Sequence, residues 1–198
     1  MNTFSQTPKW LIAMDTETGG IPDEVSILTA YFALCKLENN ILTIEDELDL
    51  KIKPDNRVYR ITAESLEINK INLVNHEKNA IFEKAAGQLL YKKLSEWYGI
   101  AKDKLIPLGH NIGFDIRKIT TTLLTKGNWD NFVSYRTLDT CTIAQFFRLS
   151  GKLPDGLSCS VVNLSEFFQI SVDGAAHEAK YDTLVTIEIF NHLKKLTI

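Results

Sequence analysis

Two carboxylates near the start of the chain stand two positions apart, directly after a short apolar run. Asp15 and Glu17 follow residues 10–14, and the pair Gly19 and Gly20 comes next. Side chains at positions i and i+2 of a strand point to the same face, so we expect both carboxyl groups at one spot. The glycines would allow a sharp turn and a close approach of the backbone to a ligand. Taken alone, such a pair is also typical of a solvated strand end, so its chemistry depends on partners elsewhere in the chain.

A third carboxylate follows a later apolar stretch. Asn111, Phe114 and Asp115 come shortly after residues 104–108, which are predicted to form a buried strand. Ligands of open α/β sheets bind at the carboxyl ends of strands, so we expect Asp115 to approach Asp15. The alternative role for Asp115 is helix capping, because an acidic side chain in the first turn of a helix is stabilised by the helix dipole.

A histidine and a fourth carboxylate lie near the end of the chain. His177 precedes Asp182 by five positions, and on a helix the two side chains would diverge by about 140°. Gly174 indicates a loop, so a helix that begins near Ala179 would leave His177 free to fold back over Asp182. Structural roles are assigned to the other histidines, which are His76, His110 and His192.

The elements that must position these groups begin with an antiparallel set of strands. Residues 10–14 are predicted to form a central strand that ends at the first two carboxylates. Residues 25–36 and 41–52 are rich in β-branched and aromatic side chains, and residues 38–40 provide a turn between them. Apolar and charged residues alternate over residues 48–52, as they do in an outer strand with one face in water.

Two β-α units are predicted to follow. Residues 104–108 form a strand, and the apolar face of the next helix runs over residues 112–123. Residues 133–138 form a further short strand, after which Asp139 caps a helix over about residues 140–149. The predicted sheet therefore has five strands.

One long amphipathic helix is predicted before the first of these units. Asn75 or Asn79 is expected to cap it, and it runs to Tyr98 and stops at Gly99. Shorter or later helices are predicted at residues 63–67, 161–168 and 179–196. We therefore expect the α/β class, with an antiparallel meander and parallel strands flanked by helices, in a single domain over residues 1–198.

Composition limits the class of protein. The chain has 22 Lys and Arg against 25 Asp and Glu, a net charge of -3, so any binding of nucleic acid must be local. A hydrophobic content of 44% excludes intrinsic disorder. The longest uncharged run, residues 25–35, is too short to span a membrane, and the first apolar run is too short for a secretory signal, so we expect a cytoplasmic protein. Buried thiols are expected at the three cysteines, which are Cys35, Cys141 and Cys159.

Taken in order, three motifs resemble those of the DEDDh (DnaQ-like) 3′-to-5′ exonuclease family. They are Asp15-x-Glu17-Thr18-Gly, His110-Asn111-x-x-Phe114-Asp115 and His177-x-Ala179-x-x-Asp182. The resemblance covers nearly the whole chain. It implies a ribonuclease H-like fold and an enzyme that hydrolyses phosphodiester bonds from the 3′ end and releases nucleoside 5′-monophosphates. One departure, Gly19 where the family commonly has Thr or another small residue, bears on substrate preference more than on activity.

Four carboxylates in close contact would repel one another unless divalent cations neutralise them. Oxygen ligands and the absence of a Cys/His cluster favour Mg²⁺ or Mn²⁺ over zinc, and two ions are expected. By resemblance to the family, Asp15 bridges the two ions, and Glu17 and Asp182 complete the site of the ion that activates water. Asp115 would support the second ion, and His177 would be the general base.

The resemblance also implies contacts with the terminal nucleotides of the substrate. The candidates are Thr18, Gly20, Ile21, Asn111 and Phe114, although core packing would equally explain Ile21 and Phe114. Because the net charge is negative, the expected substrate is a short single-stranded 3′ end rather than an extended duplex. The cations that could hold it are Lys70, Arg117, Lys118 and Lys180.

Two further interpretations of the same residues are open. DNA is slightly favoured because residues 64–73 resemble a stretch of DNA-directed relatives, but an RNA-directed 3′-to-5′ exoribonuclease is the alternative. A DNA exonuclease of this kind would serve repair or proofreading, with a polymerase or another replication protein as partner. The other interpretation is a catalytically silent nucleic-acid-binding or polymerase-docking module. Its signature would be a degenerate site, whereas all five side chains are present here.

Overall fold

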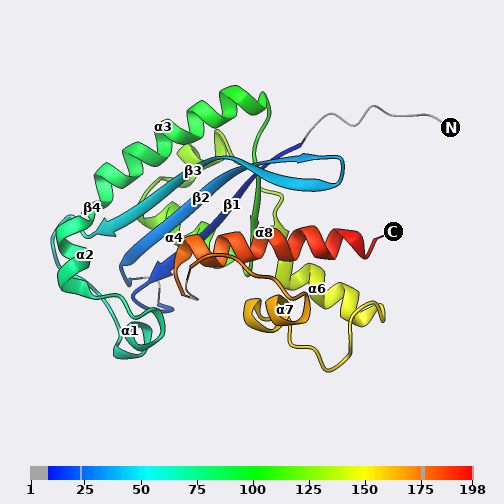
Figure 1. Ribbon diagram of the computed structural model, residues 1–198. Helices are drawn as coiled ribbons and strands as arrows, with labels where there is room; N and C mark the ends of the chain where they lie inside the picture. The colour runs from blue at the N-terminus through cyan, green and yellow to red at the C-terminus, as the bar shows by residue number, and fades with distance from the viewer. Residues whose placement is uncertain (1–8, 23, 175–176, 198) are drawn as a thin grey trace.

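A six-stranded mixed sheet forms the centre of the molecule, in the strand order β4-β3-β2-β1-β5-β6 (Figure 1). The computed structural model describes residues 9–22, 24–174 and 177–197. The strands are β1 (Lys9–Thr18), β2 (Ile27–Glu38), β3 (Ile41–Lys53), β4 (Ile81–Phe82), β5 (Ile106–Gly109) and β6 (Leu138–Asp139). β1, β2 and β3 form the antiparallel meander, whereas the β1/β5, β5/β6 and β3/β4 pairs are parallel. The expected fold class is confirmed, with β4 as a sixth strand that was not predicted.

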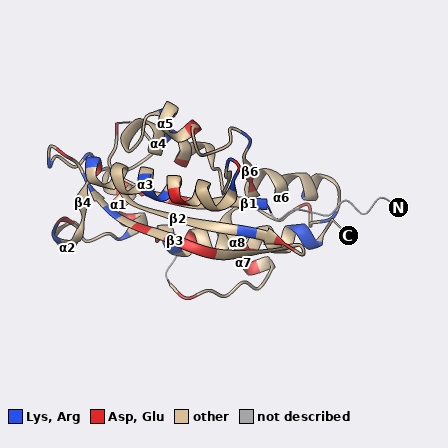
Figure 2. Ribbon diagram, turned by 90° about the horizontal axis from the view of Figure 1, so that it is seen from above, with Lys and Arg blue, Asp and Glu red and all other residues tan. Residues whose placement is uncertain are grey.

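Helices cover both faces of the sheet (Figure 2). They are α1 (Ala63–Asn69), α2 (Leu73–Asn79), α3 (Glu83–Ala101), α4 (Gly113–Thr122), α5 (Lys126–Asp130), α6 (Thr140–Leu149), α7 (Val161–Phe167) and α8 (Ala179–Lys195). α3, α4 and α5 pack on one face, and α8 packs on the other with α7 beyond it. No helix in the described ranges is both long enough and apolar enough to cross a bilayer.

Side-chain alternation along β1 assigns its residues to the two faces. Ile12 and Met14 belong to the core under α3 and α4. Leu11 and Ala13 belong to the core under α8, where they meet Ile187. Because the alternation continues along the strand, the next odd-numbered residues of β1 also face α8. All three cysteines are free; Cys35 and Cys159 are buried as expected, whereas Cys141 is partly exposed.

The β2–β3 hairpin turns at two asparagines. Asn39 and Asn40 have positive φ angles of 51° and 65°, the backbone conformation of a type I′ turn, which asparagine tolerates. The predicted antiparallel pair and its turn are therefore confirmed.

β3 is an edge strand over most of its length. It pairs with β4 only through Ile52 and Lys53, so within the described ranges the preceding residues have no strand on their outer side, and the Asn191 side chain bonds the main chain there at Leu42. The exposed positions of that stretch include Glu45, Glu47 and Asp49. Charged side chains on an edge strand discourage pairing with other chains.

The long helix differs from its prediction at both ends. Asn75 and Asn79 do not cap it, because they lie in the separate helix α2, which Asn72 caps through its side chain. α3 starts after Phe82, which makes no side-chain cap hydrogen bond. Gly99 does not end α3; the helix continues to Ala101 and ends at Lys102, which adopts the left-handed conformation.

The strand predicted at residues 133–138 is much shorter than expected. Only Leu138 and Asp139 form β6, and Val133 contributes a single bridge to Leu105. A strand of two residues is too short to have a recognisable sequence pattern, so tertiary contacts decide where it begins and ends. The capping prediction is confirmed, since the Asp139 carboxylate accepts the backbone N–H groups of Cys141 and Thr142.

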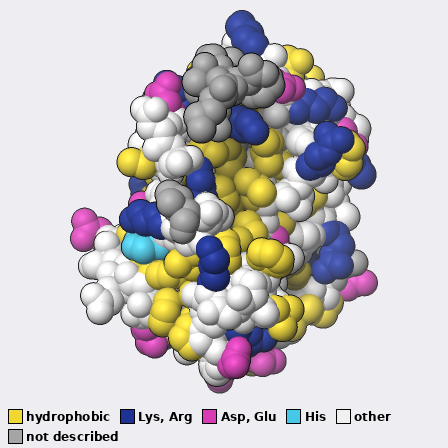
Figure 3. Space-filling model, turned by 90° about the vertical axis from the view of Figure 1, so that its right-hand side faces the viewer, with side chains coloured by type: hydrophobic (Ala, Val, Ile, Leu, Met, Phe, Trp, Pro, Cys, Tyr) yellow, Lys and Arg dark blue, Asp and Glu magenta, His cyan; other side chains and the backbone are white. Residues whose placement is uncertain are grey.

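Charge is mixed over the fold. Lys and Arg alternate with Asp and Glu along the helices and strands (Figure 2). The face at the amino-terminal end of β1 shows apolar side chains with Lys and Arg around them (Figure 3). These views agree with the net charge of -3 and show no single basic side on the faces drawn.

Candidate active site

β1 delivers Asp15 and Glu17 to the α8 side of the sheet. In the antiparallel pairing Asp15 lies opposite Tyr31, and Glu17 lies opposite Thr29. The register shifts between Glu17 and Thr18, where the chain leaves the ladder. Both carboxylates are half-buried at the carboxyl end of the strand, on one face as expected.

Asp115 approaches from α4. The parallel pairing of β1 with β5 brings the first turn of α4 beside β1, although the residues are far apart in sequence. Asp115 is buried, and its Oδ1 accepts the backbone N–H of Thr16 at 3.0 Å and the Thr16 hydroxyl at 2.7 Å. The carboxylate therefore ties α4 to β1, which helix capping alone would not do.

His177 and Asp182 approach from the start of α8. His177 has a positive φ angle of 68° and lies outside the helix, which begins at Ala179. Its backbone N–H donates to Asp182 Oδ2 at 3.1 Å, so the turn folds back over Asp182 as the spacing predicted. Glu17, His177 and Asp182 each offer one ligand atom, and these atoms all lie within 4.8 Å of one another.

Mutual repulsion marks the convergence of the four carboxylates. Burial raises the pKa of Asp15 well above its ordinary value, and the charges of Asp115, Glu17 and Asp182 raise it further. Burial, followed by the charges of Asp182 and Asp115, raises the pKa of Glu17 to about 8. The four groups thus act on one another electrostatically, from three separate elements.

The other two carboxylates have compensating partners. Burial raises the pKa of Asp115 to about 7, although the hydrogen bonds from Thr16 lower it. Burial raises the pKa of Asp182, and His177 counteracts this effect. Without a cation, these groups hold protons more readily than isolated carboxyl groups do.

Carboxylate oxygens clustered in this way suit a hard divalent cation. The donor set is mainly oxygen, and a bound cation would replace the protons that the crowded carboxylates otherwise retain. The residues present therefore fit a divalent metal site. His177 is the one nitrogen donor in the group of three that the 4.8 Å separation defines.

Comparison with known proteins gives one curated relative. The chain is 28% identical over 186 residues to Ribonuclease T of Buchnera aphidicola subsp. Cinara cedri (strain Cc), covering 92% of this chain and 80% of that protein. No protein-family model matches the chain.

Solved structures share the fold. E. coli Exonuclease I in complex with a dT13 oligonucleotide superimposes with a TM-score of 0.72 at 18% identity over 94% of this chain. The zinc-bound form of the E. coli ExoI-ssDNA complex gives a TM-score of 0.74 at 16% identity over 94% of this chain. This chain spans only 41% and 40% of those two chains. Sequence motifs, a relative and the fold now agree.

The chain thus resembles the DEDDh exonucleases in its motifs, a ribonuclease in its sequence and E. coli Exonuclease I in its fold.

The residues expected to contact nucleotides lie at the end of β1 and in the segments that follow β1 and β5. Thr18 is buried and donates its hydroxyl to the Gly20 carbonyl at 2.8 Å. Ile21 is 80% exposed, so core packing does not explain it. Asn111 is exposed and donates its backbone N–H to Asp139 Oδ1 at 3.1 Å, and Phe114 is half-buried.

The Lys and Arg side chains that were expected to hold nucleic acid differ in their exposure to solvent. Lys118 is fully buried, and its ammonium donates to the Pro22 carbonyl, so its expected contact with nucleic acid is wrong. The side chain instead supports the turn that presents Ile21. Lys70 and Arg117 are exposed, whereas the Lys180 ammonium is paired with a carboxylate of β3.

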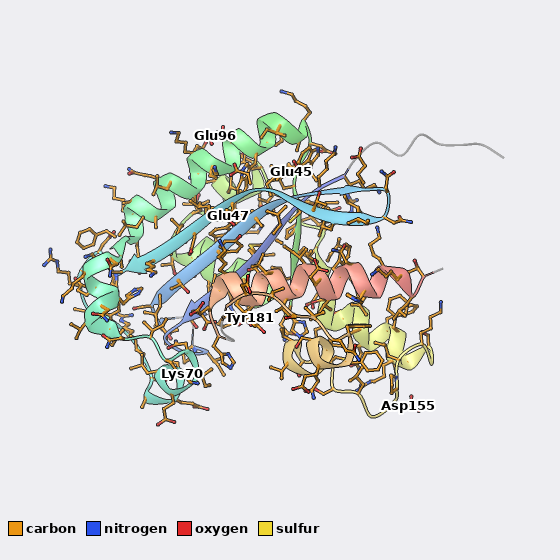
Figure 4. All side chains as sticks on the ribbon, in the orientation of Figure 1. Glu45, Glu47, Lys70, Glu96, Asp155 and Tyr181 are labelled. Carbon is orange, nitrogen blue, oxygen red and sulfur yellow. The ribbon has the colours of Figure 1, made fainter. Side chains whose placement is uncertain are left out.

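A polar pocket of about 380 Å³ adjoins His177. Thr29 and Lys51 lie on its sheet side, and Asn69 and Lys70 lie on the α1 side. Lys70, which lines the pocket directly after α1, is labelled in Figure 4. His177 therefore borders a space lined mainly by polar side chains.

Thr16 is a site residue that sequence reasoning missed. It stands between Asp15 and Glu17, and strand alternation places it on the opposite face, towards α4. The alternation was visible in the sequence, but its partner Asp115 was not, because the contact joins residues 99 positions apart.

Proposed function

We propose that the protein is a metal-dependent 3′-to-5′ exonuclease that hydrolyses phosphodiester bonds at single-stranded 3′ ends and releases nucleoside 5′-monophosphates. The observation that carries the proposal is the convergence of four carboxylates and one histidine at the carboxyl end of β1. Burial and then the charges of the neighbouring carboxylates raise the pKa of Asp15 and of Glu17, as expected where such groups converge. The 28% identical relative is named as a ribonuclease, which supports the same class of reaction.

Two divalent cations, Mg²⁺ or Mn²⁺, would be held by the four carboxylates. Asp15 would bind both ions, Glu17 and Asp182 would complete one site, and Asp115 would support the other with its Oδ2, since Oδ1 is engaged by Thr16. The bound ions would supply charge stabilisation for the attacking and leaving oxygens of an in-line displacement at phosphorus. One neighbour is described as zinc-bound, but an oxygen-rich donor set favours the harder ions here.

His177 would remove the proton from the attacking water. Its backbone N–H is occupied by Asp182, which fixes the turn and leaves the imidazole to act as a base. Imidazole is suited to proton abstraction near neutral pH. The exposure of His177 provides a route for that proton to reach solvent.

Nucleotide contacts would be made beside the carboxylates. The exposed Ile21 would pack against the terminal base, and Phe114 would stack on a base. Thr18, Gly20 and Asn111 would hold the sugar-phosphate backbone. DNA is proposed as the preferred substrate because residues 64–73 resemble DNA-directed relatives, and RNA is the alternative that the Ribonuclease T relative supports.

The test uses 5′-labelled single-stranded oligonucleotides of matched DNA and RNA sequence. A ladder of products shortened from the 3′ end is expected with Mg²⁺ or Mn²⁺, and none is expected with chelator or with Asp15→Ala. Asp130→Ala, on the distant helix α5, is the matched control and should retain activity. A wild-type protein that binds the oligonucleotide but never shortens it would establish the silent binding module instead.

A further inference from the structure

A cluster of Tyr31, Glu47 and Lys180 connects the first turn of α8 to two central strands. The Lys180 ammonium donates to Glu47 Oε1 at 2.9 Å and to Oε2 at 3.2 Å. The Tyr31 hydroxyl donates to the same carboxylate. Lys180 also lies over the Tyr31 ring, 5.3 Å from its centroid. The Glu47 carboxylate on β3 thus joins Tyr31 on β2 to Lys180 on α8. Figure 4 shows Glu47 on β3 above the start of α8.

Charge and protonation suit the cluster at neutral pH. Hydrogen bonds from Tyr31 and then Lys180 hold the pKa of Glu47 below its ordinary value. Burial and the Glu47 hydrogen bond raise the pKa of the Tyr31 phenol. Glu47 therefore stays ionised, and the buried Tyr31 stays a donor. The Lys180 and Glu47 side chains are 44% and 48% exposed, and such a pair adds little to overall stability.

The cluster lies next to two parts of the candidate active site. Lys180 is three positions after His177 and two before Asp182. Tyr31 is the direct cross-strand partner of Asp15. Among the described residues, Glu178 at the N-cap of α8 makes no side-chain cap hydrogen bond to the first turn. Buried Ala179 gives this turn one attachment to the sheet, and Lys180 gives it a second.

We propose that Tyr31, Glu47 and Lys180 are positioning residues that hold the first turn of α8 at the orientation in which His177 and Asp182 face the β1 carboxylates. The proposal rests on the proposed exonuclease function. It gives Lys180 a different role from the nucleic-acid contact expected from its charge, because its ammonium is already engaged by Glu47. The two roles differ in what they predict: loss of a substrate contact raises KM, whereas loss of orientation lowers kcat.

The test measures kcat and KM for a single-stranded oligonucleotide with Lys180→Ala, Glu47→Gln and Tyr31→Phe. Each substitution is expected to lower kcat about tenfold, since a small displacement of reacting groups has a large effect on rate. KM is expected to stay within about twofold, and Tm within about 3 °C, as for loss of an exposed ion pair. Lys180→Arg should retain most of kcat. Lys180→Glu combined with Glu47→Lys should recover activity that each single reversal loses.

Two controls keep the proposal separate from general stability and from the exonuclease assignment. Lys126→Ala removes a comparable exposed ion pair with Asp130 on α5 and should leave kcat unchanged. The NMR signals of the His177 imidazole in metal-free protein should move with Lys180→Ala and not with Lys126→Ala. An unchanged kcat together with unmoved His177 signals would overturn the proposal, as would a rise in KM alone. An inactive wild type whose His177 signals still respond would count against the exonuclease function while supporting the positioning role.

Discussion

Asp115 is a buried carboxylate that depends on one hydroxyl. Its Oδ1 accepts two hydrogen bonds from Thr16, and these lower its pKa against the effect of burial. Thr16→Val keeps the shape of the side chain and the backbone N–H but removes the hydroxyl. We expect the pKa of Asp115 to rise and the affinity for Mn²⁺ at pH 7 to fall about tenfold, because hydrogen bonds to charged groups contribute about 1.5–3 kcal/mol. Calorimetric titration with Mn²⁺ measures this.

The matched control for that substitution is Thr121→Val. The Thr121 hydroxyl donates to the Arg117 carbonyl on the exposed side of α4 and touches no carboxylate. Its affinity for Mn²⁺ should equal that of the wild type. If Thr16→Val also binds Mn²⁺ like the wild type across the pH range, the hydroxyl has no part in presenting Asp115.

Substitution of His177 separates proton removal from metal binding within the site. His177→Ala removes the imidazole but leaves a backbone N–H to donate to Asp182. We expect turnover to fall by roughly 10² to 10⁴, the usual contribution of a general base, while the four carboxylates still bind Mn²⁺. Single-turnover cleavage of the oligonucleotide and calorimetry measure the two effects. His192→Gln, on the far part of α8, is the control, and equal activity of His177→Ala and wild type would refute the role of base.

The individual catalytic candidates could be predicted from the sequence, but their surroundings could not. Strand alternation suffices to place Asp15 and Glu17 on one face, and a five-residue spacing suffices to exclude His177 from the helical face of Asp182. The direction of Lys118 could not be foreseen, because a charged residue on a short helix is ordinarily placed in water. Its burial follows from the position of the Pro22 carbonyl, which only the fold defines.

At the scale of elements, the turn after β1 depends on a close approach of two backbones. The Gly19 N–H donates to the Ser26 carbonyl, and the Gly19 carbonyl accepts the Thr62 N–H. A Cβ on Gly19 would overlap the Arg60 carbonyl oxygen. Gly19→Ala should therefore lower the free energy of unfolding by about 1–3 kcal/mol. Denaturation by urea measures the change.

A second glycine provides the opposite case for comparison. Gly99 lies inside α3, and a Cβ there would meet nothing within 4 Å. Gly99→Ala should stabilise the protein by about 0.5–1 kcal/mol, because alanine loses less backbone freedom in a helix. Similar destabilisation by both substitutions would contradict the close packing of Gly19 and the open surroundings of Gly99.

Long elements with local sequence signals were predicted better than short ones. The long helices α3 and α8 and the β2–β3 hairpin have periodic patterns or turn residues. Helix α8 and the hairpin were predicted to within a few residues, whereas α3 was predicted with the wrong caps. Helices α2 and α5 have seven and five residues, too few for a periodic pattern to stand out. The predicted end of α3 at Gly99 was wrong because a glycine can end a helix but does not have to. Lys102 adopts the left-handed conformation at the C-cap instead.

At the scale of the whole molecule, the carboxylate cluster links stability to pH and to metal. The pKa values of Asp15, Glu17, Asp115 and Asp182 are raised in the folded protein, so the folded state binds more protons than the unfolded state. Stability of the metal-free protein should then fall as the pH rises from about 4.5, the ordinary value for Glu17, through about 8. We expect a Tm in chelator that is a few degrees lower at pH 8.5 than at pH 6.

Divalent cations should cancel this loss, because they neutralise the same charges and stabilise the state that binds them. Melting curves with Mg²⁺ at pH 8.5 should therefore rise most, and those at pH 5 should rise least. Glu17→Gln in chelator should show a weaker decline with pH than the wild type. If its decline is as steep, the slope comes from groups elsewhere in the molecule.

The outer margin of β3 has a consequence for behaviour in concentrated solution. Beyond Leu42, which Asn191 bonds, the main-chain groups that no strand covers could accept a strand from another molecule, yet the same stretch displays Glu45, Glu47 and Asp49. Two copies that paired through this edge of β3 would place negative charges against each other. Acidification that neutralises these carboxylates removes that repulsion, so fibril-like self-association would begin from this strand rather than from the buried sheet interior.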